Sequence, residues 1–296
     1  MANNKSSLFA GISNASIQID EYDLTNGVFL RKTYAHFMSP QMMAFKEANP
    51  GKHHPAPWVA VNGGSSFDIL IELEISSAEN LPGNLSQKET IWWIAALLRL
   101  AYYPYLVVPA ISNISFASAP TSVIPPNIEP FETNPRIFSA ENKQQAVISE
   151  EKLSWIKDVW VSGAGLIASN EKLRTAIEAL DFSTVHGRTS SSLLAVWGGL
   201  EQLFSPSSSE LRFRVSANIA AFLEKPGEKR LELFKKLYEL YNHRSQAAHT
   251  AKAIEHSYLI ESFVVLRNVI VKILDEQFIP NKEWFERELF SPTDNN

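Results

Sequence analysis

The spacing of apolar residues changes along this chain, and that change limits the folds that it can adopt. From Phe67 to Ile75 apolar residues occupy every second position, which is typical of a half-buried β-strand. Beyond residue 145 they recur every three or four positions, which is typical of amphipathic helices. A proline-rich segment, residues 120–135, separates the two patterns. We therefore predict an α+β protein, with a mixed α/β domain over residues 1–145 and a helical domain over residues 146–296.

Further elements are expected in the first domain. Residues 27–34 and 58–61 read as strands, and residues 106–116 as an extended segment. A helix is expected over residues 86–101, because Ser86 and Glu89 have the spacing of a capping box. The polar face of the alternating strand carries three acidic residues, and we expect that face to meet solvent. These are Asp68, Glu72 and Glu74.

Composition excludes several classes of protein. The chain has no cysteine, so disulfides, thiolate metal sites and a cysteine nucleophile are ruled out, and a reducing cytoplasm is expected. The most apolar run, residues 91–98, is well short of the roughly 20 residues that span a bilayer, and no signal peptide is recognisable, so we expect a soluble protein with no membrane partner. Net charge is −5, with about −4 before and about −1 after residue 150. Any contact with nucleic acid must therefore come from a local cluster of side chains.

Six helices are expected beyond residue 145, each marked by apolar residues on one face. They begin near residues 153, 173, 193, 211, 231 and 253. Ser207 and Glu210 form a second capping-box pattern before the fourth helix. The last helix, ending near Phe278, is apolar nearly all round, so we expect a central helix that a second subunit covers in part.

Residues 241–249 join an amphipathic helix to that apolar one, and they hold Arg244 and His249. Arginine supplies a permanent charge shaped for phosphate, and histidine titrates near neutrality, so the pair suits RNA cleavage without a metal. The spacing alone is weak, since chance produces it roughly once in a chain of this composition. Arg31 and His36 have the same spacing in a strand, where alternation places them on opposite faces.

Helix geometry constrains how Arg244 and His249 act. Five residues of continuous helix give about 7.5 Å of rise and about 140° of rotation, so the two side chains do not reach one phosphate oxygen. Either the helix breaks between them, or the site takes residues from a second copy of the chain.

The region from about residue 150 to 276 resembles the HEPN superfamily, in particular its ApeA-like branch. The branch has a helix that ends in Tyr-x-x-Arg-Ser, followed by three residues and His. Two upstream helices are similar as well, one with a central Glu before an apolar pair and one that opens Ser-Glu-hydrophobic-x-hydrophobic-Arg. The matching residues here are Tyr241, Arg244, Ser245, His249, Glu201, Leu203, Phe204, Ser209, Glu210, Leu211, Arg212, Phe213 and Arg214. Thr250 departs from the branch, which usually has Gly after the His.

The resemblance implies an all-α HEPN bundle that acts as a metal-independent endoribonuclease without a cofactor. HEPN ribonucleases dimerise so that two motifs face each other, which implies a homodimer, RNA as substrate, and Arg244 and His249 as catalytic residues. It further implies a bacterial anti-phage or toxin system, in which residues 1–145 sense a trigger, bind a partner such as a phage or regulatory protein, or restrain the nuclease. The alternative is a non-catalytic HEPN module that dimerises or binds nucleotide or RNA as a scaffold.

Other polar residues near the motif have supporting roles or none. His243 either assists phosphate binding or lies on the surface, and Ser245 either binds phosphate or caps the next turn. Tyr241 is expected to pack. Glu201 and Arg212 are expected to form an ion pair that stabilises the bundle. Elsewhere, His53 and His54 have no partner ligands at a helical spacing, so a metal site is not expected there.

Overall fold

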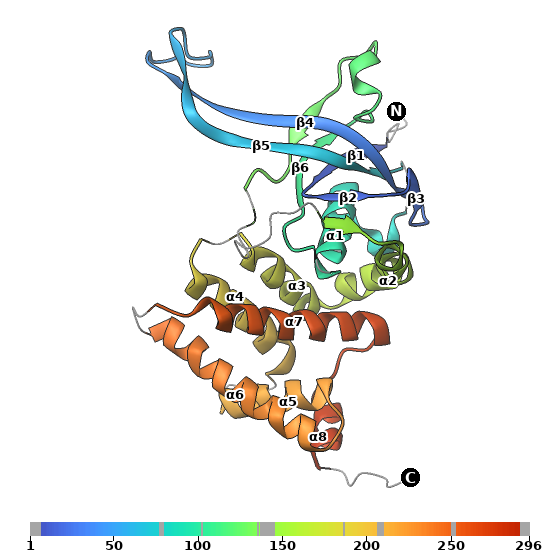
Figure 1. The fold of residues 1–296 in the computed structure, drawn as a ribbon, viewed down its shortest axis with the longest axis vertical. Coiled ribbons are helices and arrows are strands. Elements are labelled where there is room, and N and C mark those ends of the chain that lie inside the picture. The colour runs from blue at the N-terminus through green and yellow to red at the C-terminus, as the bar shows by residue number, and fades with distance from the viewer. Residues whose placement is uncertain are drawn as a thin grey trace. The chain divides into compact units, whose positions relative to one another are not determined.

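The computed structural model shows an α+β protein, with an antiparallel sheet followed by a helical region (Figure 1). It describes residues 7–76, 80–101, 103–134, 136, 146–185, 187–205, 210–249 and 253–290. Within these residues, no helix has both the length and the apolar character needed to cross a bilayer.

Contacts divide the chain into two compact units. Unit 1 contains residues 1–79, 105–135 and 142–153, and unit 2 contains residues 80–104, 136–141 and 154–296. The helix over residues 87–100 therefore groups with the helical unit, although the boundary expected at residue 145 placed it in the first domain. The domain boundary itself stays a prediction.

Unit 1 is built on a six-stranded sheet in the order β3-β4-β5-β1-β6-β7, and its neighbouring strands are all antiparallel. A separate parallel pair joins β2 to β8. β4 and β5 are much longer than the other strands and run on as a two-stranded hairpin (Figure 1). The strands are β1 (Leu8–Ser13), β2 (Ala15–Ile17), β3 (Glu21–Asp23), β4 (Val28–Ala44), β5 (Trp58–Ile75), β6 (Val107–Ser112), β7 (Ile128–Pro130) and β8 (Ala146–Ile148).

The alternating segment is confirmed as the inner half of β5, and its apolar residues are buried. They are Phe67, Ile69, Ile71, Leu73 and Ile75. The expectation of a solvated acidic face is wrong for Glu72, which is only 2 % exposed. The chain returns over this face after β6, and the backbone N–H of Phe116 donates to the Glu72 carboxylate at 2.5 Å. Burial raises the pKa of Glu72 despite this hydrogen bond.

The proline-rich segment is irregular, as predicted, except for two short elements. A 3-10 turn occupies residues 119–121, and β7 ends at Pro130. β7 is the last strand of the sheet, where a residue without an N–H is tolerated because no further strand needs its hydrogen bond.

Unit 2 is helical. α1 has the predicted capping box, in which Ser86 accepts from the N–H of Glu89 while the Glu89 side chain accepts from Ser86. A 3-10 turn at Pro82–Asn84 precedes it. The helices are α1 (Gln87–Leu100), α2 (Glu150–Ser169, whose first turn belongs to unit 1), α3 (Glu171–Ser183), α4 (Thr189–Phe204), α5 (Leu211–Leu223), α6 (Glu228–His249), α7 (His256–Glu276) and α8 (Lys282–Phe290).

Three expectations about the helices have clear outcomes. α7 packs against α3, α4, α5 and α6, so the prediction of a central helix is confirmed. The capping box before α5 is wrong, because Glu210 is itself the N-cap residue, in a left-handed conformation with no capping side-chain hydrogen bond. Ser207, like Ser209, lies outside the described residues. α8 had no counterpart in the sequence analysis; it buries Phe285 against Phe204 of α4.

Buried polar contacts attach α1 to the other helices of unit 2. The indole N–H of Trp93 donates to the Trp160 carbonyl at 2.9 Å, and the Arg267 guanidinium donates to the Leu100 carbonyl at 2.6 Å. Both interactions satisfy backbone carbonyls with side chains that are distant in sequence. They explain why α1 groups with the helical unit.

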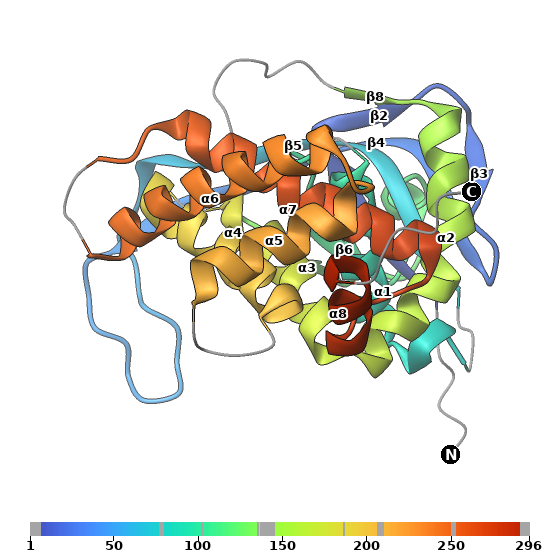
Figure 2. The ribbon, with the colours of Figure 1, turned by 90° about the horizontal axis from the view of Figure 1, so that it is seen from below.

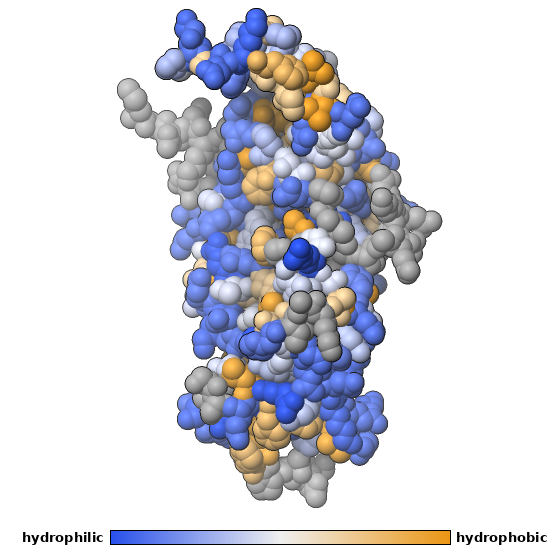
Figure 3. All heavy atoms as spheres, turned by 90° about the vertical axis from the view of Figure 1, so that its left-hand side faces the viewer, coloured by the Kyte–Doolittle hydropathy of each residue, from blue (hydrophilic) through white to orange (hydrophobic). Residues whose placement is uncertain are grey.

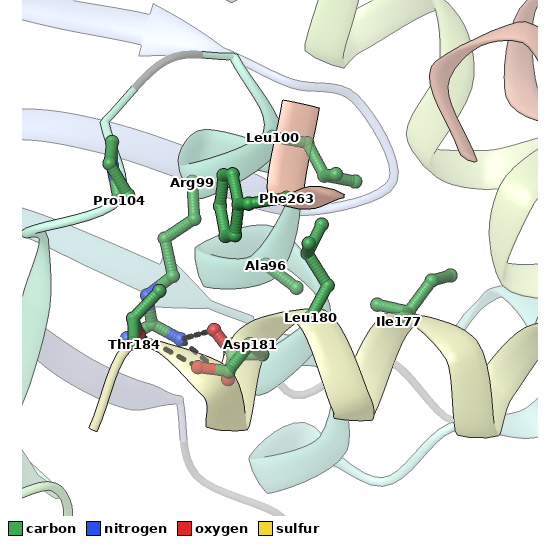
Figure 4. Close-up of a pocket in the computed structure, with 9 residues that line it drawn as sticks. All are labelled: Ala96, Arg99, Leu100, Pro104, Ile177, Leu180, Asp181, Thr184 and Phe263. Atoms are coloured by element: carbon green, nitrogen blue, oxygen red, sulfur yellow. Dashed lines mark hydrogen bonds and ion pairs between the residues drawn. The ribbon is translucent and has the colours of Figure 1, made fainter. Parts of the chain in front are cut away.

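A second anchor for α1 is a buried charge cluster at the end of α3. Arg99 of α1 reaches Asp181 at 2.9 Å (Figure 4). Arg136 reaches the same carboxylate at 3.0 Å. Both arginine side chains are 5 % exposed. The adjoining cavity is about 10 Å³, which leaves room for about one water and no substrate. We therefore interpret the cluster as structural.

Asp181→Asn is expected to lower the free energy of unfolding by about 3 kcal/mol, because two buried guanidiniums lose the carboxylate that they share. Urea denaturation followed by circular dichroism measures the change. The control is Asp68→Asn, which removes a half-exposed carboxylate paired with His36 and should cost less than about 1 kcal/mol. Equal effects of the two substitutions would contradict the structural importance of Asp181.

Candidate functional site

Arg244 and His249 lie on one unbroken helix. α6 runs from Glu228 to His249, so His249 is its last residue (Figure 2). The helix does not break between the two residues, which removes the first of the two arrangements considered from the sequence. At about 1.5 Å per residue, α6 holds Arg244 and His249 about 7.5 Å apart along its axis. One copy of the chain thus presents the two groups separately.

Arg244 is held by a carboxylate from the neighbouring helix α4. Its Nη2 atom lies 3.0 Å from Oε2 of Glu201 and 3.0 Å from Oε1. The Tyr241 hydroxyl donates to Oε1 of the same carboxylate at 2.9 Å. Glu201 therefore links two residues of α6 that are one turn apart, and both of them belong to the sequence motif.

Tyr241 supports this arrangement from the core, as predicted for a packing residue. Its ring is buried and meets Trp197 of α4 edge-on, with 5.1 Å between ring centroids. The Trp197 N–H donates in turn to Ser262 of α7 at 3.0 Å. Burial, together with the hydrogen bond to Glu201, raises the pKa of Tyr241 to about 12. The phenol thus stays protonated and donates to Glu201 at neutral pH.

The guanidinium of Arg244 keeps one unused donor. Its side chain is 24 % exposed, and its Nε atom is buried without a hydrogen-bond partner in the described part of the chain. A buried donor without a partner costs free energy, so such a group calls for an explanation. Nε itself is out of contact with solvent, so an anion can reach Arg244 only at the exposed part of its side chain.

The other residues of the motif differ in their exposure and in their contacts. His249 is exposed at the end of α6, where a second molecule has access to it. His243 stacks on Tyr258 of α7, with ring centroids 3.5 Å apart and an interplanar angle of 13°, so one of its ring faces is covered. Ser245 is half-buried.

The expected ion pair between Glu201 and Arg212 is replaced by other contacts. Glu201 pairs with Arg244, whereas Arg212 of α5 donates to the side chain of Asn242 and lies 4.1 Å from the centre of the Tyr238 ring. Arg212 still contacts α6 within one turn of Arg244. Spacing along the chain did not indicate which cation meets Glu201, because the two candidates, Arg212 and Arg244, lie on different helices.

The second Arg–His pair is distributed over the sheet of unit 1. Arg31 binds Glu21 and Glu74, and His36 contacts Asp68 at 2.8 Å. Each side chain has its own carboxylate partner, so the two form no joint site. Nδ1 of His54 lies 2.9 Å from the Lys46 carbonyl, and no three His, Asp or Glu side chains gather for a metal within the described residues.

Comparison of the chain with protein-family models, with curated proteins and with solved structures finds no match.

Tyr241→Phe tests the Glu201–Tyr241–Arg244 cluster. Loss of the hydroxyl is expected to lower the free energy of unfolding by about 1 kcal/mol at pH 8. The pKa of Tyr241 is raised in the folded state, so its contribution is complete below about pH 10 and decreases as the pH rises toward about 12. Between pH 8 and pH 11 the unchanged protein should thus lose more stability in urea denaturation than the variant. An equal loss of stability in the unchanged protein and the variant over this range would contradict the contribution of the Tyr241 hydroxyl.

Proposed function

We propose that the protein is a metal-independent endoribonuclease of the HEPN type, active as a homodimer in which two α6 motifs face one RNA phosphate. The resemblance in sequence suggests this chemistry. The observation that carries the proposal is the unbroken α6, which holds a positioned arginine and an exposed histidine too far apart for one chain to use on one phosphate. Two half-sites related by two-fold symmetry remove that difficulty.

The reaction uses the RNA's own 2′-OH as nucleophile. His249 of one copy accepts the 2′-OH proton while the oxygen attacks phosphorus. The bond from phosphorus to the 5′-oxygen breaks, and His249 of the other copy donates a proton to that leaving oxygen. The products are a 2′,3′-cyclic phosphate and a 5′-hydroxyl, and no water is consumed.

Arg244 has the role of binding the non-bridging phosphate oxygens, whose charge grows in the transition state. The Glu201 carboxylate fixes one guanidinium nitrogen and leaves Nε without a partner within the described residues. This arrangement positions the cation before RNA binds, which reduces the ordering needed in the transition state. Glu201 and Tyr241 are therefore positioning residues in this proposal. Ser245, His243 and Arg212 are supporting residues.

Exposed apolar side chains on α5 and α7 are suited to the contact between two helical units. Ile260 and Val264 lie one turn apart on α7, and Phe213 of α5 packs edge-on against Phe234 of α6. All three of Ile260, Val264 and Phe213 are exposed in the single chain. They fit the expectation that a second subunit partly covers α7.

The biological setting follows from the resemblance alone. A cytoplasmic toxin or antiviral nuclease is the setting that we propose, with unit 1 binding a regulatory protein or a phage trigger. A non-catalytic scaffold is the second candidate. Two observations favour the scaffold. The Glu201 carboxylate compensates the charge of Arg244, and the chain as a whole has a net charge of −5.

Arg244→Ala and His249→Ala are each expected to lower RNA cleavage at least 100-fold, since each removes a group that acts on the reacting phosphate. Cleavage of a labelled RNA is measured by gel, and mass spectrometry identifies the cyclic phosphate. Matched controls are Arg287→Ala, at an exposed arginine on α8, and His36→Ala, at the histidine of the second Arg–His pair. Equal activity of all variants, or loss of wild-type activity on adding EDTA, would reject the proposal.

Mixing experiments test whether the site is shared between copies. When wild-type protein is mixed with increasing amounts of His249→Ala and subunits are allowed to exchange, activity should fall with the square of the wild-type fraction. That dependence arises because a site with two catalytic histidines needs two intact copies. A linear decrease would indicate that each chain holds a complete site.

A further inference from the structure

The outer part of the β4–β5 hairpin, residues 33–66, has two unpaired strand edges. β3 pairs with β4 only up to Arg31, and β1 pairs with β5 only as far as Ile69. Beyond those residues, no other strand of the described chain joins the hairpin. We call residues 33–66 the distal hairpin. Its backbone N–H and C=O groups along both edges face outward.

Large apolar side chains cover both faces of the distal hairpin. Met43 pairs with Val59 on one face, and Ala44 pairs with Trp58 on the other. Figure 3 looks at the side toward which the hairpin extends, and hydrophobic atoms gather at its upper end. The exposed residues are Tyr34, Met38, Met42, Met43, Phe45, Trp58 and Val59, each 51 to 69 % accessible.

The strands of the distal hairpin have no charged side chains. Residues 33–44 and 58–66 contain no Asp, Glu, Lys or Arg, and Lys46, Glu47 and Lys52 lie in the connecting loop. A nucleic acid backbone needs several cations along its path, which these strands lack. A bilayer would leave the open backbone edges without hydrogen-bond partners. Methionine and aromatic residues without charges are instead typical of the buried centre of a protein–protein interface.

The size of this surface matches a stable interface between proteins. Aromatic side chains bury about 150–250 Å² each, so covering these seven side chains removes on the order of 800 Å² from water, which is about one partner's share of a standard interface. A two-stranded hairpin on its own is marginally stable in water. The distal hairpin is anchored in the sheet at its base, and a partner that covers its outer part would stabilise that part further.

We propose that the distal hairpin is a dimerisation arm that packs against the distal hairpin of a second copy of this chain. A second copy is available from synthesis onward, whereas a partner that arrives later would leave these apolar faces in water in the meantime. Charge does not oppose self-association, since the two strands have none. The interface lies in unit 1 and does not depend on the proposed nuclease activity.

The two strand edges differ in their capacity to pair with the second copy. Pro40 lies on the edge of β4 and has no N–H to donate. The edge of β5 has no proline from Trp58 to Ser66, and its register with β4 shifts between Ala60 and Gly64, so Trp58–Ala60 is the regular outer part of that edge. We therefore expect the two copies to pair along β5, antiparallel about a two-fold axis, so that Val59 and Val61 lie near their counterparts.

Single cysteines test this arrangement, because the chain contains none of its own. Val59→Cys and Val61→Cys in the full chain should form disulfide-linked dimers under mild oxidation. Val123→Cys, at a fully exposed position in unit 1 outside the arm, is the control for random collision. Yields no higher than that of Val123→Cys at both β5 positions would overturn the proposal, as would a wild-type protein that sediments as a monomer at tens of micromolar.

A threonine variant tests the apolar contact without disturbing the hairpin. Met43→Thr with Val59→Thr removes the apolar surface of one cross-strand pair but keeps residues that favour strands. In proteins that also carry Val264→Asp, which removes the helical contact proposed above, the dimer dissociation constant from analytical ultracentrifugation should rise at least tenfold, whereas Val123→Thr with Ile124→Thr should leave it unchanged. An unchanged constant for the first variant, without cross-linking at Val59→Cys or Val61→Cys, would place the interface elsewhere. RNA cleavage is not part of either measurement, so failure of the nuclease proposal leaves the outcome readable.

Discussion

One carboxylate, Asp181, fixes α1 and the segment at Arg136 to the end of α3 in unit 2. Asp181 binds Arg99 and Arg136, which precede it by 82 and 45 residues, and all three side chains are largely removed from water. Charges in such surroundings are stable only when they are paired, so the end of α3 can pack only with both arginines in place. α1 is thereby committed to the helical unit, although its sequence neighbours β5 and β6 build the sheet.

The candidate site also depends on a carboxylate that pairs with an arginine. Its two side chains are more exposed than those of Arg99 and Asp181. Glu201 of α4 receives Arg244 and Tyr241 of α6, while Trp197 packs beneath Tyr241 and hydrogen-bonds to α7. Three helices therefore fix the position of one guanidinium. His249 is treated differently, because it ends α6 and is exposed. A rigid cation beside an accessible titratable group suits the proposed division between phosphate binding and proton transfer.

In unit 1 the inner half of the β4–β5 hairpin packs into the core, whereas its outer half is exposed. Phe67 and Ile69 are buried, whereas Met43 and Trp58 on the same two strands are more than half exposed. The difference arises because β1 and β3 are short and end before the hairpin does. Exposing an apolar surface of this size to water is unfavourable in free energy, and burying it in an interface removes that penalty.

The sequence by itself determined the local structure. Strict alternation identified β5, the Ser86–Glu89 spacing identified the start of α1, and apolar periodicity located most of the helices, because each of these signals depends on residues only a few positions apart. Only the tertiary structure decided the long-range partners. Glu201 meets Arg244 instead of Arg212, and Glu72 is covered when the chain returns at Phe116. Such contacts depend on which surfaces the packed elements bring together, and a local pattern contains no information about that choice.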